Sequence, residues 1–436
     1  MKTQTIPLST QYQEVICSIF GKREDLLFFD IETTGLSPKS ASVYLIGAAG
    51  KENGSWVMHQ WFAENTAMEE AVLDAFTQYA ASFGTLVHFN GTTFDVPFLQ
   101  ARCKKYGLHC TLANMAQLDI YRQISPWKNF LRLANCKQRT LEEFLGIFRE
   151  DPFNGGQLIS LYHAYRENRD ERLLKVLLLH NADDIRGMLS ILPMLAYPAL
   201  LGGGVNRTDQ VPGQGQQGRP PSGLGGHGEG MPEPERTASF AVPSFAPPFT
   251  ILEHAIVSGT DYAGNPQKEL FIRLKLSHPL PASLACNGQG CFFSAQQADG
   301  LLKIPVFTGE LKYFYPDYKN YSYLPEEDNA IHKSVAIYVD KAHRVPATPE
   351  TCYTRKTGAF LPLPVGAGKG TRKGNGAGAT LCGQEKAAAD AAVSCGLLFR
   401  RSAKEKECFF LMDDAFLQDE DKMACYVAWI LTGILH

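Results

Sequence analysis

The chain has 436 residues, of which 44% are hydrophobic and 20% are charged, and its formal net charge is −3. This size and composition fit a soluble globular protein with two or three domains. A charge so close to zero excludes a global basic field, so any binding of nucleic acid must use local patches.

Cysteine usage and hydropathy narrow the class of protein further. The 11 cysteines are scattered and include no C-x-x-C pair, which argues against a zinc site and favours reduced thiols. The first 20 residues lack the pattern of a secretory signal, and no apolar segment is long enough to cross a bilayer. We therefore expect a cytoplasmic protein that does not contact a membrane, and nothing in the sequence indicates its oligomeric state.

Residues 1–200 show the mixed order of strands and helices that is typical of an α/β domain. The Asn-Gly pair at positions 53 and 54 predicts a hairpin between the second and third strands. Apolar spacing predicts helices at Thr10–Phe20, Glu69–Ser82, Pro97–Tyr106 and Glu171–Met194. It predicts five strands, at Leu26–Glu32, Ser42–Gly50, Trp56–Phe62, Thr85–Phe89 and Met115–Ile120.

The composition changes abruptly near Leu201. Residues 201–248 are rich in Gly, Pro and Gln and predict a flexible linker. Residues 249–436 predict a second domain, of α+β class. Its expected elements are strands at Phe249–Val257, Glu269–Leu276 and Val335–Asp340, a Gly-rich basic stretch at Gly366–Gly378 and a helix at Lys422–Leu435. Six aromatic residues between 313 and 323 are interleaved with lysines, and we expect them to form a core rather than a surface that stacks bases.

The strand that begins at Leu26 carries the first candidate site. Side chains alternate along a strand, so Asp30 and Glu32 point to the same side. Two neighbouring carboxylates repel each other, and a divalent cation such as Mg²⁺ or Mn²⁺ is the natural partner for both. For a lone D-x-E pair, a strand end with two solvated acids is the more common explanation, so the metal interpretation depends on further ligands.

Two other motifs supply such ligands. Asp95 closes the loop Asn90–Asp95, which follows an apolar strand, at the edge of the sheet where sites form in open α/β folds. His180 and Asp184 lie four residues apart, on one face of the helix expected at Glu171–Met194. Asp183 is an alternative to Asp184 at this position.

Together these motifs resemble the DEDD superfamily of 3′–5′ exonucleases, which has an RNase H-like fold. Asp30-x-Glu32 matches its first motif, and Asn90 with Phe94-Asp95 matches the second. Asp184 keeps the four-residue spacing of the third, with His180 where that branch has tyrosine. The segments Leu118–Arg122 and Arg139–Ile147 are similar to the YprB-type RNase H-like domains of bacterial proteins, and the resemblance covers residues 26–195.

The resemblance implies an RNase H-like mixed five-stranded sheet flanked by helices. It implies two divalent cations, Mg²⁺ or Mn²⁺, held by the four carboxylates Asp30, Glu32, Asp95 and Asp184. His180 would act as the general base or orient the attacking water, because its usual pKa of about 6.5 suits that work near neutral pH. Substrate contacts are expected from Thr33, Thr34, Leu36 and Asn90.

The resemblance therefore implies a metal-dependent 3′–5′ exonuclease that hydrolyses phosphodiester bonds of DNA or RNA by a two-metal mechanism. Its expected substrates are single strands or 3′ ends. Two alternatives remain open at this point. One is a nucleic-acid-binding module without catalysis on the same scaffold, and the other is a structure-selective endonuclease. The sequence does not decide between DNA and RNA.

Overall fold

The computed structural model describes residues 1–149, 155–201, 248–260, 264–363 and 398–435. These residues form two compact units, the first of which spans Met1–Pro198. The expected linker at 201–248 and the Gly-rich stretch at 366–378 lie almost entirely outside the described residues. Within those residues, none of the helices has the length and hydropathy that crossing a bilayer requires.

The first unit is built on a mixed sheet of six strands in the order β1-β4-β3-β2-β5-β6. Strands β5 and β6 run parallel to β2, whereas β1, β3 and β4 pair antiparallel. The expectation of five strands was short by one, because the half-exposed β1 pairs with β4 at the sheet edge and lacks an apolar run. The strands are β1 Lys2–Pro7, β2 Leu26–Thr33, β3 Val43–Glu52, β4 Ser55–Phe62, β5 Thr85–His88 and β6 Ala116–Asp119.

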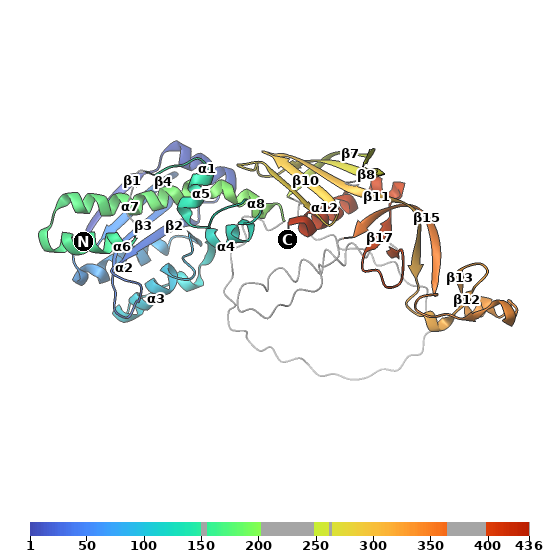
Figure 1. Ribbon diagram of the computed structural model, residues 1–436. Helices are drawn as coiled ribbons and strands as arrows, with labels where there is room; N and C mark the ends of the chain where they lie inside the picture. Colours follow the sequence, from blue (N-terminus) through green and yellow to red (C-terminus); the bar gives the residue numbers. More distant parts are fainter. Residues whose placement is uncertain (150–154, 202–247, 261–263, 364–397, 436) are drawn as a thin grey trace, which may run out of the picture. The chain divides into compact units, whose positions relative to one another are not determined.

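Helices cover both faces of this sheet (Figure 1). Phe28 of β2 packs against Phe20 of α1, whereas the next residue, Phe29, packs against Phe76 of α2 on the opposite face. The helices are α1 Thr10–Phe20, α2 Glu69–Ala80, α3 Asp95–Tyr106, α4 Ile120–Ile124, α5 Gln138–Phe144, α6 Gly155–Asn168, α7 Glu171–Ser190 and α8 Ala196–Ala199. A mixed sheet flanked by helices is the predicted RNase H-like architecture.

The second unit is rich in β structure, with one principal sheet, a small sheet β13-β12-β14 and a C-terminal helix. Helix α12 packs closely on β9, where a side chain at Gly288 would touch the backbone of Ile434. The strands are β7 Phe249–Thr260, β8 Pro266–Leu276, β9 Leu284–Gly288, β10 Cys291–Gln296, β11 Asp299–Phe314, β12 Tyr321–Leu324, β13 Asn329–His332, β14 Val345–Pro346, β15 Tyr353–Leu363, β16 Leu398–Arg400 and β17 Cys408–Leu411. The helices are α9 Lys333–Ala336, α11 Asp414–Gln418 and α12 Glu420–Leu435.

The strand expected at Val335–Asp340 is wrong. This segment begins inside α9, which His332 caps by accepting a hydrogen bond from the backbone N–H of Ser334. Asp340 caps the following short turn, so polar caps at both ends override the β propensity of the apolar residues between them.

The tyrosines of the second unit pack into a small core, as expected. Tyr315 and Tyr321 stack with ring centroids 4.4 Å apart. They pack against a buried cluster formed by Ala330, Ala347 and Cys352.

Candidate metal centre in the first unit

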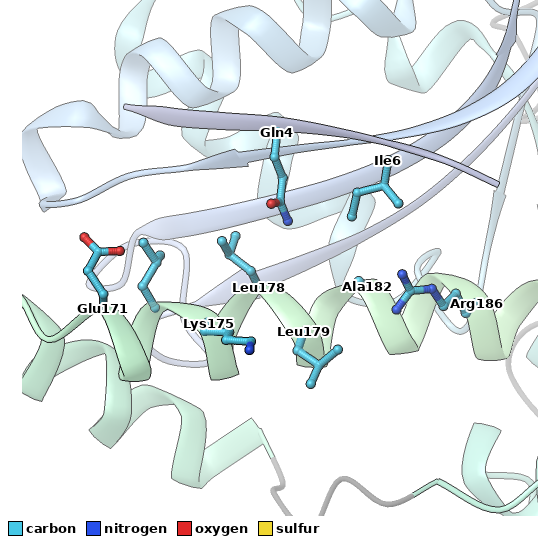
Figure 2. Close-up of a pocket in the computed structure, with 9 residues that line it drawn as sticks. Gln4, Ile6, Glu171, Lys175, Leu178, Leu179, Ala182 and Arg186 are labelled. Atoms are coloured by element: carbon cyan, nitrogen blue, oxygen red, sulfur yellow. The ribbon is translucent and has the colours of Figure 1, made fainter.

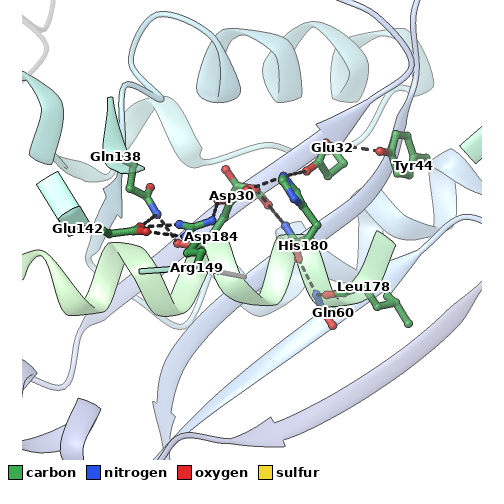
Figure 3. A network of polar contacts seen from close by, with 11 residues as sticks. Asp30, Glu32, Tyr44, Gln60, Gln138, Glu142, Arg149, Leu178, His180 and Asp184 are labelled. Carbon is green, nitrogen blue, oxygen red and sulfur yellow. Dashed lines mark hydrogen bonds and ion pairs between the residues drawn. The ribbon is translucent and has the colours of Figure 1, made fainter. Parts of the chain in front are cut away.

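Strand β2 positions the first two candidate ligands. Asp30 lies opposite Gly47 of β3, and Glu32 lies opposite Leu45. Both carboxylates lie on the face of the sheet that α7 covers (Figure 3). Side chains alternate along a strand, so the buried Ile31 between them points to the other face. The hydroxyl of Tyr44 donates to Glu32 Oε2 at 3.4 Å.

Helix α7 brings His180 and Asp184 onto these acids (Figure 3). Nε2 of His180 lies 3.2 Å from Asp184 Oδ2 and 3.7 Å from Glu32 Oε1. One ligand atom from each of Glu32, His180 and Asp184 lies within 4.8 Å of the others, which is a spacing that one metal ion can bridge. The neighbouring Asp183 instead pairs with Arg186 at 2.9 Å, so the structure brings Asp184 and not Asp183 into the cluster.

Asp95 reaches the same place from the loop after β5. It is the first residue of α3, and a backbone hydrogen bond from Ile31 reaches its carboxylate. The loop is held by Asp119, whose Oδ1 accepts from the N–H of Asn90 at 2.8 Å. Asn90 has a φ of 61°, in the left-handed region that asparagine tolerates, and it lies in the turn that leads from β5 into α3.

The pKa values of the four carboxyl groups reflect their burial and their closeness to one another. Burial, followed by the charges of Asp184, Asp95 and Glu32, raises the pKa of Asp30 well above its usual value. Burial also raises the pKa of Glu32 to about 8 and that of Asp95 to about 7. Burial would raise the pKa of Asp184 too, but His180 and Arg149 outweigh that effect and hold it below its usual value. Carboxylates in this arrangement favour a bound cation.

The side chains expected to contact substrate are mostly engaged within the protein. Thr33 Oγ1 donates to a main-chain carbonyl at 2.9 Å, and Thr34 Oγ1 accepts from a main-chain N–H at 2.9 Å. The amide oxygen of Asn90 accepts from Thr93 Oγ1 at 3.0 Å. Leu36, in contrast, is 84% exposed in the turn after β2 and is available for contact.

Two buried residues that sequence reasoning missed join α7 to the sheet. Asn181 Nδ2 donates to Asp30 Oδ2 at 3.0 Å, and its Oδ1 accepts from Gln60 Nε2 at 2.7 Å. Asn181 is fully buried and lies against Gly47, where a methyl group would overlap its amide. A polar amide at the same helical spacing as Leu177 and Ile185 was the available signal, because such a residue on an apolar face needs buried partners.

A polar network on the other side of Asp184 was missed as well. It contains Arg149, Glu142 and Gln138, which come from α5 and the segment after it. The four-residue spacing of Gln138 and Glu142 on a helix was visible in the sequence, but their partner on α7 was not.

A separate hollow of about 270 Å³ lies on the first unit, away from this cluster (Figure 2). It contains none of the candidate ligands. Its lining comes from β1 and α7: Gln4, Ile6, Glu171, Leu174, Lys175, Leu178, Leu179, Ala182 and Arg186.

Comparisons with known proteins agree with this architecture. A family model of the RNase H superfamily, RNase_H_2, matches residues 27–196. The uncharacterized protein YprB of Bacillus subtilis (strain 168) is 26% identical over 175 residues. That match covers 39% of this chain and 41% of the relative, so the chain spans less than half the length of that curated relative.

Two solved structures are also similar. A family B DNA polymerase from Pyrobaculum calidifontis has 13% identity and a TM-score of 0.35, over 93% of this chain and 46% of the polymerase. The zinc-bound E. coli ExoI–ssDNA complex has 14% identity and a TM-score of 0.25, over 37% of this chain and 45% of that chain. On the family model and the observed fold, residues 27–196 form a domain of the RNase H superfamily.

Proposed function

We propose that this chain is a metal-dependent 3′–5′ exonuclease of the DEDD type, which hydrolyses phosphodiester bonds of DNA or RNA. The observation that carries the proposal is the convergence of four carboxylates and one imidazole. These residues come from three separate segments and lie close together: Asp30 and Glu32 from β2, Asp95 from α3, and His180 and Asp184 from α7.

The donor set fits hard divalent cations. Carboxylate oxygens are the ligands that Mg²⁺ and Mn²⁺ prefer. Burial, followed by the charges of neighbouring acids, raises the pKa values of Glu32 and Asp95, and a bound cation would offset both effects. Asp30, Glu32, Asp95 and Asp184 would hold two such ions. When bound, the ions supply an activated water and stabilise the leaving 3′ oxygen.

The side chains of the chain itself have distinct roles in this scheme. The charges of the other three acids reach Asp30, so Asp30 would hold metal together with them. His180 lies between Glu32 and Asp184 and would accept or orient the proton of the attacking water. The exposed Leu36 would pack against the terminal base.

The test is Mn²⁺-dependent digestion of 5′-labelled single-stranded DNA and RNA by the wild type and by Asp30→Asn. We expect a ladder that shortens from the 3′ end and is lost in Asp30→Asn. Asp183→Asn is the matched control, because Asp183 is an acid of α7 that pairs outside the cluster, and it should keep the wild-type activity.

Two substrates separate the alternatives. Cleavage of circular DNA or of a strand with a blocked 3′ end would indicate an endonuclease. Binding of single strands without cleavage of any substrate, by folded and metal-loaded protein, would instead indicate a binding module.

A further inference from the structure

The largely buried guanidinium of Arg149 lies beside the candidate metal centre (Figure 3). Its side chain is 13% exposed. Nη1 donates to Asp184 Oδ1 at 2.5 Å, while Nε and Nη2 donate to the two carboxylate oxygens of Glu142 at 2.6 Å and 2.5 Å. Arg149 therefore links a fully buried acid of α5 to a candidate ligand of α7.

The surroundings of Arg149 are built to hold this geometry. Gln138 Nε2 donates to Glu142 Oε1 at 3.0 Å and to the main-chain oxygen of Asp184 at 2.8 Å. Gly187 lies three residues after Asp184 on α7. A methyl group at Gly187 would overlap both the Glu142 carboxylate and the Arg149 guanidinium, so the close approach requires glycine.

We propose that Arg149 is a positioning residue that fixes the Asp184 carboxylate for metal binding. It occupies Oδ1, so that Oδ2, the oxygen 3.2 Å from His180, is the one presented to the ion. The bidentate pair with Glu142 holds the guanidinium plane and neutralises its charge, and one donor remains directed at Asp184. This inference rests on the proposed function, since it assigns Asp184 to a metal ion.

A direct contact between Arg149 and substrate phosphate is the competing role, and the geometry argues against it. The side chain is almost buried, and its donors already serve two carboxylates. A phosphate would have to displace Asp184 or Glu142 to reach it. Loss of Arg149 should therefore weaken metal binding rather than substrate binding.

The experiment measures Mn²⁺ affinity by electron paramagnetic resonance in the absence of nucleic acid. Removing Arg149 alone would leave Glu142 as a buried unpaired charge, which destabilises the fold. The double variant Glu142→Gln/Arg149→Gln avoids this, and its thermal unfolding without metal should remain cooperative. We expect its Mn²⁺ affinity to fall about 10- to 100-fold, the usual effect of losing a partner of a ligand.

Arg186→Gln is the matched control, because Arg186 is an arginine of the same region that pairs with Asp183 outside the cluster. Its Mn²⁺ affinity should equal that of the wild type. Arg149→Lys keeps the positive charge but not the planar set of guanidinium donors, so it should give an intermediate Mn²⁺ affinity. In kinetics, saturating Mn²⁺ should restore most of kcat in the double variant with an unchanged KM for the oligonucleotide.

An affinity in the double variant that equals or exceeds that of the wild type would overturn the inference. An increase would mean that Arg149 competes with the ion for Asp184. Failure of the wild type to bind Mn²⁺ would also overturn it. If the wild type binds Mn²⁺ but digests neither DNA nor RNA, the proposed exonuclease fails, and the affinities alone decide the role of Arg149.

Discussion

The substitution Asn181→Leu tests how the candidate metal centre is held on the sheet. Leucine has the branched shape and the four side-chain heavy atoms of asparagine but no polar atoms, so the variant loses the bonds to Asp30 and Gln60 without opening a cavity. One N–H of Gln60 and one oxygen of Asp30 would then lack these partners inside the protein.

The magnitude follows from the burial of these groups. Leaving a buried polar group unsatisfied costs about 1–3 kcal/mol, so two such groups should lower the free energy of unfolding by about 3 kcal/mol. For a unit of this size, that loss lowers the Tm by roughly 6–12 °C. The effect should appear in the first unit, because Asn181, Asp30 and Gln60 all belong to it.

Urea unfolding followed by tryptophan fluorescence is a suitable assay. Trp56, Trp61 and Trp127 lie in the first unit and Trp429 lies in the second, so the signal mainly reports the first unit. Gln78→Leu is the control, since Gln78 is an exposed amide that donates to Asp74 on the same helix, and it should change stability by less than about 0.5 kcal/mol. An equally small effect of Asn181→Leu would refute this account of the link between α7 and the sheet.

Three further predictions concern the same centre. Gly47→Ala should destabilise the first unit by about 1–3 kcal/mol in urea unfolding, because the added methyl group overlaps the buried amide of Asn181. An unchanged urea midpoint would contradict this. Asp119→Ala should lower Mn²⁺-dependent activity, because it removes an acceptor of the loop that carries Asp95, and hydrogen exchange at the N–H of Asn90 should become faster; unchanged exchange would exclude this role. Burial raises the folded-state pKa values of Glu32 and Asp95 to about 8 and about 7, so the folded state binds these protons more tightly than the unfolded state. In EDTA, the difference between the Tm of the wild type and that of Glu32→Gln should therefore fall as pH rises from about 4 through 8. Mg²⁺ should raise the Tm of the wild type more at pH 8 than at pH 6. A Tm difference that rises with pH would contradict this prediction.

Local periodicity determined much of the first unit. Alternation along a strand placed Asp30 and Glu32 on one face, and the four-residue helical spacing placed His180 beside Asp184. These relations depend only on backbone geometry over a few residues, so a sequence pattern can predict them. The same reasoning failed where no pattern exists, as in the half-exposed strand β1, and where polar caps decided the conformation after His332.

Tertiary structure alone decided what surrounds the candidate ligands. Asn181 reaches Asp30 across 151 residues of sequence, and Arg149 reaches Asp184 across 35 residues. Such partners leave no periodic signal, because their pairing depends on how α5 and α7 pack against each other and against the sheet. The sequence identifies the acids that repel one another, but only the folded chain shows which donors bind them. The reason is that tertiary packing determines which groups come within hydrogen-bond distance of a buried polar side chain.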